Sequence, residues 1–339
     1  MPATVVSDTY GELLTSTARD IRSKVIDQIF NGFPTLQWME SKGSIRRSTA
    51  GGHEIQVNVN FQKNSTAKSY SGYDVIDTSP QDTATMSHTP WKFYAGSVSI
   101  SEDERLKNMG EHAFFNLLTH KTKVGIESVR DKLVTDIYTD AASDPTKAIT
   151  PMSLIMDDVA TSTVGGVSGN TNTWWQNYET DVGAFGTGLY NDMLTAYNTQ
   201  SRGAVDFPDT YIFSLTGFEF FERFITGIGA GGTGAGAGGF RMAVNPKNGD
   251  VGFETLKFKG ADVFFDPAIA SGMPVSGETC FVINTKYLHY YIHPQAEFTL
   301  GEFIKPTDQH ARVALINHMC SLVTDARWKL GILHGIDPS

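Results

Sequence analysis

An α+β fold is predicted for this chain of 339 residues by three observations. Strand-like and helix-like segments both occur, but they do not alternate regularly as they would in a doubly wound parallel sheet. An alternating strand leads into a long polar excursion, and an unusually long helical pattern follows. Apolar residues make up 40% of the chain, which is enough for a sizeable core and excludes wholesale disorder.

Composition and charge argue against several classes of protein. The 27 basic and 37 acidic side chains give a formal net charge of −10, which disfavours tight general binding to nucleic-acid phosphates. The sequence contains no run of about 18 apolar residues, so it predicts no membrane-spanning helix. The first residues lack the basic and apolar blocks of a secretory signal. Two cysteines, Cys280 and Cys320, fit a reducing compartment. We therefore expect a soluble protein of intracellular origin without a membrane partner.

Two features hint at contact with other protein. Charged residues make up only 19% of the chain, below the roughly one quarter typical of globular domains, which is either ordinary variation or a sign of a covered surface. Near the start, one helical face carries Leu14, Ala18, Ile21, Val25 and Ile29. The Asn-Gly-x-Pro sequence at 31–34 ends this helix. It is either an ordinary first helix or an arm that docks on a neighbour.

The next segment predicts an extended hairpin. Residues 53–61 alternate strictly between apolar and polar side chains, which is typical of a half-buried strand. A polar excursion over 62–90 separates it from a second strand-like run at 91–100. Unstructured connections of this length are usually functional, and a two-stranded ribbon is marginal alone in water. We expect residues 53–61 to pair with 91–100 and another surface to cover the ribbon.

A long helix follows the predicted hairpin. Ser101 to Glu104 form a capping box with acidic residues in the first turn. The helical pattern then runs to about Tyr138, with a kink predicted at 108–110, and Phe114, Leu118, Val129, Leu133 and Ile137 share one face. From Glu111 to Thr139 a straight helix measures roughly 44 Å, which is longer than most helices in globular domains.

The remaining pattern mixes short helices and strands. Helices are predicted at 189–197 and 218–225, and a buried strand at 211–215. Further strands are predicted at 256–258, 261–265, 281–283, 287–292, 313–319 and 320–330. Residues 227–240 are nearly all glycine and alanine, which predicts a flexible loop.

No catalytic, cofactor or metal site is predicted. The glycine tract contains GxGxxG at Gly227, Gly229 and Gly232, but a helical pattern precedes it and more glycine follows, contrary to a dinucleotide site. His289 and His293 lie in a strand-like segment without a further metal ligand at a suitable spacing. Asp74, Asp77 and Asp82 do not have calcium-loop spacing and are predicted to make turns. An enzyme with a dispersed active site, such as a hydrolase, stays open as an alternative.

One block of sequence is similar to a known family. Residues 51–82 and the following strand resemble the major capsid (coat) protein of tailed double-stranded DNA bacteriophages, in which a GG-x-x-I…N-x-T…Y-x-GYD-x-x-DTSPQD segment precedes a WK-x-Y strand and a long helix. Further similar stretches, in the same order, are TVGGVSG around Gly165 and Gly166 with Trp175, FKGADV at 258–263 and the region 308–331. The glycine tract departs from the family. The matching residues of the block are Gly51, Gly52, Ile55, Asn64, Thr66, Tyr70, Gly72, Tyr73, Asp74, Asp77, Thr78, Ser79, Pro80, Gln81, Asp82, Trp91, Lys92 and Tyr94.

The resemblance implies an α+β tailed-phage capsid fold with four parts. These are an N-terminal arm at 1–48, an extended β-hairpin loop at 49–100, a peripheral domain with a long spine helix at 101–180 and 295–339, and an axial domain at 181–294. The family's long N-terminal scaffolding extension does not precede the arm in this sequence, so a separate scaffolding protein is expected unless the sequence begins after a maturation cleavage.

The resemblance also implies a structural function. The chain would be a subunit of an icosahedral capsid, self-assembling into hexamers and pentamers in the host cytoplasm, with a portal protein and packaged DNA enclosed without sequence-specific binding. A shell protein of a cellular nanocompartment is an alternative. The side chains expected at subunit interfaces lie on the arm, the loop and the following strand: Ile21, Val25, Ile29, Ile55, Val57, Val59, Phe61, Tyr70, Tyr73, Asp74, Asp77, Trp91 and Phe93.

Overall fold

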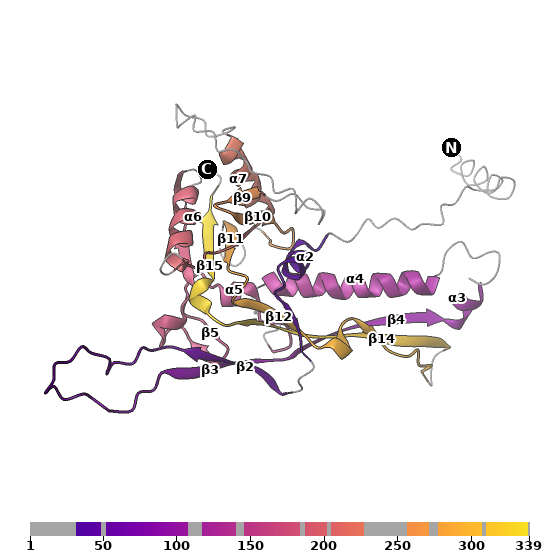
Figure 1. Cartoon of the computed structure of the whole chain (residues 1–339). Coiled ribbons are helices and arrows are strands. Elements are labelled where there is room, and N and C mark those ends of the chain that lie inside the picture. The colour runs from indigo at the N-terminus through magenta and orange to yellow at the C-terminus, as the bar shows by residue number, and fades with distance from the viewer. Residues whose placement is uncertain are drawn as a thin grey trace. The chain divides into compact units, whose positions relative to one another are not determined.

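The computed structural model describes residues 32–48, 52–107, 117–139, 146–183, 187–201, 205–226, 256–270, 277–306 and 310–337 (Figure 1). The described residues fall into two compact units. One unit contains Gly96–Ser128 and Leu300–Ile316, and the other contains Asn31–Ala95, Val129–Thr299 and Asn317–Ser339. The predicted arm helix with Ile21, Val25 and Ile29, the expected kink at 108–110 with Phe114, and the glycine tract lie outside the described residues.

A five-stranded sheet joins segments that are far apart in the sequence. Its order is β1-β12-β14-β13, and β4 also pairs with β14. The strands are β1 (Ile45–Arg47), β4 (Lys92–Ser101), β12 (Leu288–Ile292), β13 (Thr299–Leu300) and β14 (Ala311–Thr324). The prediction of separate strands at 313–319 and 320–330 was wrong, because β14 continues unbroken to Thr324 and the chain then turns through η5 (Arg327–Lys329).

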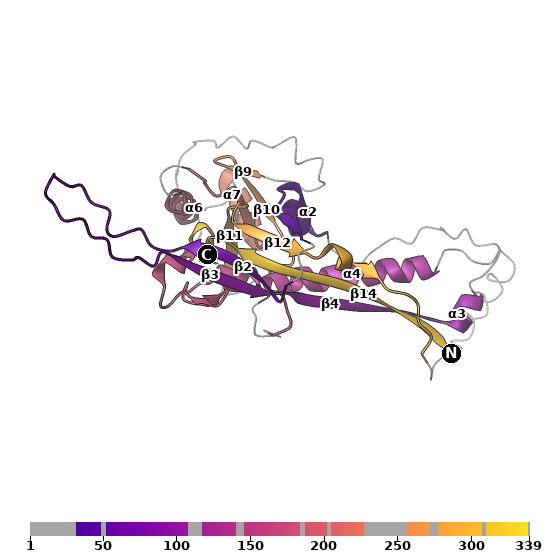
Figure 2. The ribbon, with the colours of Figure 1, turned by 60° about the horizontal axis from the view of Figure 1, so that its bottom comes forward.

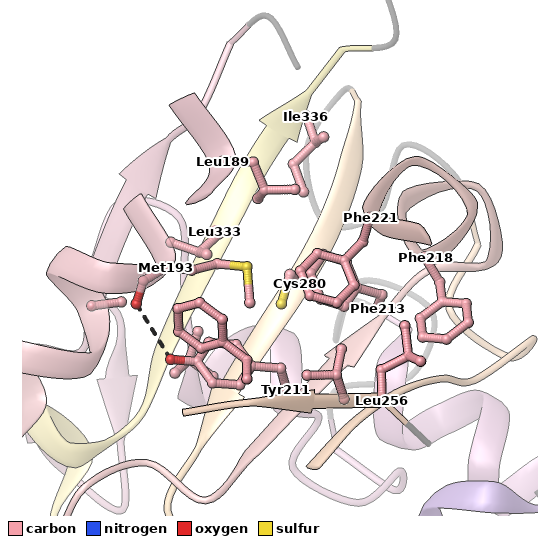
Figure 3. Close-up of a cluster of buried hydrophobic side chains, with 14 of the residues drawn as sticks. Leu189, Met193, Tyr211, Phe213, Phe218, Phe221, Leu256, Cys280, Leu333 and Ile336 are labelled. Carbon is pink, nitrogen blue, oxygen red and sulfur yellow. Dashed lines mark hydrogen bonds between the residues drawn. The ribbon is translucent and has the colours of Figure 1, made fainter. Parts of the chain in front are cut away.

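A six-stranded sheet carries a large buried core. Its order is β7-β15-β11-β8-β10-β9. Helices α6 (Thr187–Gln200) and α7 (Leu215–Thr226) contribute to a core cluster with alternate residues of these strands (Figure 3). The Tyr211 hydroxyl donates to the Met193 carbonyl at 3.3 Å within this cluster. The strands are β7 (Tyr178–Asp181), β8 (Thr210–Phe213), β9 (Leu256–Phe258), β10 (Ala261–Phe265), β11 (Glu278–Ile283) and β15 (Gly331–Ile336).

The opposite face of this sheet is also covered, which explains why its strands are apolar on both sides. The ring of Trp38 in α2 (Pro34–Ser41) lies 6.0 Å from that of Phe264, and Tyr138 lies 5.7 Å from Phe281. Thr35 donates its hydroxyl to Asp266 and also bonds Tyr138. Burial raises the pKa of the Asp266 carboxyl, and donors from Thr35 and the Ala268 amide oppose that rise.

The capping box and most of the long helix are confirmed. The Ser101 amide donates to Glu104 at 3.1 Å, and the Glu104 amide donates to the Ser101 hydroxyl at 3.1 Å. They begin α3 (Glu102–Lys107). The long helix is described as α4 (Leu117–Tyr138), in which Val129, Leu133 and Ile137 of the predicted shared face are buried, whereas Leu118 is 38% exposed. No helix among the described residues is long and apolar enough to span a membrane.

The predicted pairing of residues 53–61 with 91–100 was wrong. Strand β2 (Glu54–Asn60) instead pairs antiparallel with β3 (Ala84–Pro90), a strand within the supposed excursion. The inward residues opposite Ile55, Val57 and Val59 are Thr89, Ser87 and Thr85, so β3 has no apolar alternation to reveal it. The second predicted strand exists as β4, but its partner is β14. We call the β2–β3 pair the ribbon.

The C-terminal strands enter both sheets. Strand β14 belongs to the five-stranded sheet, whereas β15 pairs with β11 and β7 in the six-stranded sheet. The sequence-based division placed residues 295–339 together in a peripheral domain. That division groups β14 with β15, although the two strands belong to different sheets. The four-part organisation stays a proposal.

Candidate assembly surface

The ribbon ends in a long exposed loop. Residues 61–83, which we call the extended loop, connect β2 to β3 and continue beyond the ends of both strands (Figures 1 and 2). Every residue from 67 to 80 is exposed in the chain. The loop is therefore a surface that its own chain leaves free.

Hydrogen bonds between side chains and backbone shape this loop. The Asp74 carboxylate accepts from the Ser71 amide at 2.9 Å, and the Asp77 carboxylate accepts from the amide and hydroxyl of Ser79 at 3.0 and 2.7 Å. These bonds from Ser79 lower the pKa of the Asp77 carboxyl. Asn64 makes the same kind of turn with Thr66. The prediction that Asp74 and Asp77 make turns is confirmed.

Large apolar side chains lie on this shaped loop. Tyr70 is 67% exposed, Tyr73 is fully exposed, and Val75 and Ile76 are 85% and 51% exposed. Four such side chains lie within seven residues of an exposed loop, although single exposed apolar residues are normal on protein surfaces. Covering them with another surface would be favourable by about 2 kcal/mol for each side chain.

The ribbon is fixed to its own chain at three points along its length. The ring of Phe61 stacks on Trp174, with centroids 5.5 Å apart. The His88 amide donates to the Gly165 carbonyl at 2.9 Å. The Ser321 hydroxyl donates to the carbonyl of Pro90 at 3.2 Å. Trp174 belongs to η2 (Thr173–Trp175), and Gly165 joins β5 (Thr163–Val164) to β6 (Val167–Ser168).

A buried arginine organises the segment that holds the ribbon. Arg327 is completely buried, and its guanidinium donates to the carbonyls of Ile155 at 2.7 Å, Ser162 at 2.8 Å, Leu154 at 3.2 Å and Trp175 at 3.5 Å. Burial lowers its pKa to about 10, and the nearby Asp157 carboxylate opposes that shift. The arginine therefore stays charged near neutral pH and joins α5 (Met152–Ile155), the loop after it and η2.

The predicted interface residues are found in different environments. Tyr70, Tyr73, Asp74 and Asp77 lie together on the extended loop. Ile55, Val57 and Val59 are half-buried on the ribbon, and Phe61 packs on Trp174.

The two aromatic residues of the following strand differ. Phe93 is 70% exposed, whereas Trp91 is 9% exposed and lies edge-on against His293. The Trp91 side chain is thus already covered within its own chain, so an interface role for it has less support than one for Phe93.

A cavity of about 550 Å³ lies beside α2. Its wall includes Arg47 and Glu297, which form a bidentate ion pair at 2.6 and 2.8 Å, and this contact lowers the pKa of the Glu297 carboxyl. Arg130 lies 4.9 Å from the Phe298 ring centroid. Arg47, Glu297 and Arg130 of this cavity are therefore engaged in structural contacts. The remaining lining residues are Phe33, Leu36, Gln37, Glu40, Ile45, Leu133, Tyr290 and Ile292.

The other candidate residues for chemistry are buried in sheets. His289 is buried in β12, with Nε2 2.9 Å from Asp325 and 3.0 Å from Arg46. Cys280 and Cys320 are fully buried, and burial raises both thiol pKa values. Among the residues that the structure describes, no group of three His, Cys, Asp or Glu side chains is arranged to hold a metal ion.

The sequence analysis missed Arg327 and Trp174 and did not give Gly165 and Gly166 a role. The paired glycines were visible as a motif, and the two adjacent tryptophans at 174–175 could have drawn attention. Arg327 carried no signal, because a buried arginine is not distinguishable from a surface arginine by its neighbours in the sequence.

The architecture is that of tailed-phage capsid subunits. The chain is similar to the capsid asymmetric unit of cyanophage A-1(L), with a TM-score of 0.66 and 9% identity over 96% of this chain and 99% of that chain. It is also similar to the capsid of Myoviridae phage XM1, with a TM-score of 0.59 and 14% identity over 94% and 97% of the two chains.

A cellular shell protein shares this fold. The SrpI encapsulin of Synechococcus elongatus matches with a TM-score of 0.55 and 11% identity over 97% of this chain and 95% of that chain. No family model and no curated protein matches the sequence. The α+β tailed-phage capsid fold expected from the sequence is thus confirmed.

Proposed function

We propose that this chain is the structural subunit of an icosahedral phage capsid, which assembles as hexamers and pentamers into a shell around double-stranded DNA. The fold supports this proposal, since the similar structures include the capsids of cyanophage A-1(L) and phage XM1. The subunit is a component of the virion, it assembles in the host cytoplasm, and its role is structural, without catalysis.

The extended loop is the observation that carries the proposal. It is held in shape by its own hydrogen bonds, and it exposes Tyr70, Tyr73, Val75 and Ile76. A preformed apolar segment loses little conformational freedom on binding, so more of the burial energy contributes to affinity. The loop of one copy docks on another copy, and repetition around a closed shell makes many weak contacts collectively strong.

The partners follow from the same proposal. A separate scaffolding protein directs the curvature of the shell, and a portal protein occupies one site in it. The net charge of −10 suits a container that encloses DNA without sequence-specific binding.

Shortening the loop tests its role. Replacing residues 63–81 with Asn-Gly connects Gln62 to Asp82 by a two-residue turn and retains the β2–β3 pairing, in which the Phe61 amide donates to Thr83. We expect a folded chain that sediments as a small species, whereas the unaltered chain forms particles. Normal particles from the shortened chain would contradict the proposal.

A matched pair of variants separates the apolar contact from general surface effects. Serine in place of Tyr70, Tyr73, Val75 and Ile76 should also prevent assembly. Serine in place of Val159 and Val205, which are exposed by 61% and 64% outside the loop, should leave it intact. Equal defects in both variants would show that the loop has no special role.

A nanocompartment shell is the second candidate function, and the similarity to the SrpI encapsulin favours it. The content of particles isolated from the native host distinguishes the two functions. Packaged double-stranded DNA supports the phage capsid, whereas an enclosed protein without genomic DNA supports the nanocompartment.

A further inference from the structure

Gly165 and Gly166 form the turn between β5 and β6, directly beside the ribbon. Their φ angles are +60° and +77°, in the region that favours glycine. A Cβ added at Gly165 would overlap the Ser87 hydroxyl and lie 3.2 Å from the Ser87 Cβ. A Cβ added at Gly166 would overlap the His88 imidazole. The turn thus lies directly against the Ser87 and His88 side chains of β3.

Other glycines show that this approach is a separate requirement. Gly43 and Gly183 have φ angles of +71° and +63°, so their backbone conformations are similar to those of the paired glycines. A Cβ added at either of them would meet nothing within 4 Å. At Gly165 and Gly166, in contrast, the side chains of Ser87 and His88 on the ribbon occupy the space that an added Cβ would need.

The turn is also bonded to other parts of its own chain. The Trp175 indole donates to the Val164 carbonyl at 3.0 Å, and the Gly169 amide donates to the Ser162 carbonyl at 3.1 Å. Arg327 bonds that same Ser162 carbonyl. The turn is held by Trp175, Gly169 and Arg327, whereas the extended loop is exposed. If a side chain at Gly165 pushed the turn and β3 apart, the ribbon would therefore move rather than the turn.

We propose that the Gly165–Gly166 turn is a saddle that sets the direction of the ribbon and therefore the position of the extended loop. The His88 amide bond to the Gly165 carbonyl holds the ribbon on the saddle, and the missing side chains let it lie close. The saddle acts within a single chain. Its consequence for assembly, that a displaced loop misses its binding site on the next copy, rests on the proposed function.

A small change at the saddle is amplified along the ribbon. Ser87 pairs with Val57. Val57 lies four residues before Phe61, which is held by its contact with Trp174, and this corresponds to about 13 Å along the strand. The tip of the loop lies about ten residues further, or up to about 33 Å. With the buried Ser87 side chain in its present rotamer, relieving the overlap needs an opening on the order of 1 Å, and pivoting about Phe61 then moves the tip by about 2–4 Å.

Distances between two spin labels measure this movement. Labels are placed at Ser71→Cys on the extended loop and Thr199→Cys on α6, both exposed positions, while the native Cys280 and Cys320 are fully buried. Labelled chain is diluted with unlabelled chain, so that each distance lies within one chain whether or not shells form. Sedimentation measures assembly separately, so a failure of the proposal for the Gly165–Gly166 turn can be distinguished from a failure of the proposed capsid function.

Three variants test whether the Gly165–Gly166 turn sets the position of the extended loop. Gly165→Ala should shift or broaden the distance by about 2–4 Å, from the lever above, whereas Gly183→Ala, with the same backbone strain, should leave it unchanged. Adding Ser87→Gly to Gly165→Ala should restore the original distance, or restore folding if Gly165→Ala alone does not fold. An unchanged distance in Gly165→Ala, an equal change in Gly183→Ala, or no restoration by Ser87→Gly overturns the proposal.

Discussion

The ring of Phe61 lies on the indole of Trp174, with centroids 5.5 Å apart and planes inclined by 28°. Phe61 is the first residue after β2, and Trp174 lies in η2, so this contact holds the point where the ribbon becomes the extended loop. Trp174 is only partly buried, and its ring also lies 5.6 Å from that of Trp175.

The first prediction concerns this aromatic pair. Phe61→Ala and Trp174→Ala should each speed hydrogen exchange of the β2 and β3 amides, and the double variant should lose less than the sum. The coupling between the two rings should be about 0.5–1.5 kcal/mol, as for other aromatic pairs. Exchange measured by mass spectrometry gives the free energy of local opening for each variant. Strictly additive losses would show that the rings do not stabilise the ribbon together.

The second prediction concerns Arg327. Arg327→Met should destabilise the chain by about 3 kcal/mol or more, because several buried carbonyls lose their donor and each costs about 1–3 kcal/mol. Arg327→Lys keeps the charge but not the planar donor fork, and should also be destabilising. Thermal unfolding of the unassembled chain measures both. The control is Arg312→Lys, since Arg312 is half-exposed, and a loss no larger at Arg327 would refute its organising role.

The third prediction is a pH dependence. Burial lowers the pKa of His318 to about 4 from its ordinary 6.5, while Glu297 opposes the shift and Arg130 adds to it. The unfolded chain therefore takes up this proton first as the pH falls through 6.5. Stability from the neutral imidazole is present above pH 6.5 and is lost between about 6.5 and 4, for a total of about 3 kcal/mol.

His318→Gln isolates this contribution. His318 lies 2.7 Å from the Tyr290 hydroxyl and stacks on Phe298, so the variant also changes packing, and the slope of stability against pH is the informative quantity. That slope should become shallower between pH 4 and 6.5 than in the unaltered chain. An unchanged slope in His318→Gln would contradict the prediction.

The fourth prediction separates two roles of Asp77. Its carboxylate accepts two hydrogen bonds from Ser79, and asparagine keeps an acceptor oxygen at that position. Asp77→Asn should therefore assemble nearly as the unaltered chain does, whereas Asp77→Ala should assemble more slowly because the turn is lost. Light scattering during assembly compares the rates. A defect in Asp77→Asn equal to that of Asp77→Ala would show that a partner recognises the charge.

Local patterns in the sequence predicted local structure well. The alternation of Ile55, Val57 and Val59 identified β2, and Ser101 with Glu104 identified the start of α3. Strands β9 and β10 were predicted at their observed bounds. In each case the periodicity or the cap reports directly on the side chains of the segment itself.

Pairing over long distances could not be predicted in the same way. The inward face of β3 carries Thr85, Ser87 and Thr89, which do not differ from loop residues in polarity. The partner of β4 is β14, more than two hundred residues later, and no local pattern specifies it. The saddle was visible in the sequence only as two adjacent glycines, because its proposed role depends on the contact of those glycines with Ser87 and His88 of β3.

Electron cryo-microscopy of the purified full-length chain, expressed with and without a scaffolding protein, tests the central proposal most directly. The proposal predicts closed shells of hexamers and pentamers in which the density of residues 67–80 of each subunit lies on a neighbouring copy. A small species that stays unassembled under both conditions, or shells in which this loop contacts no neighbour, would contradict it.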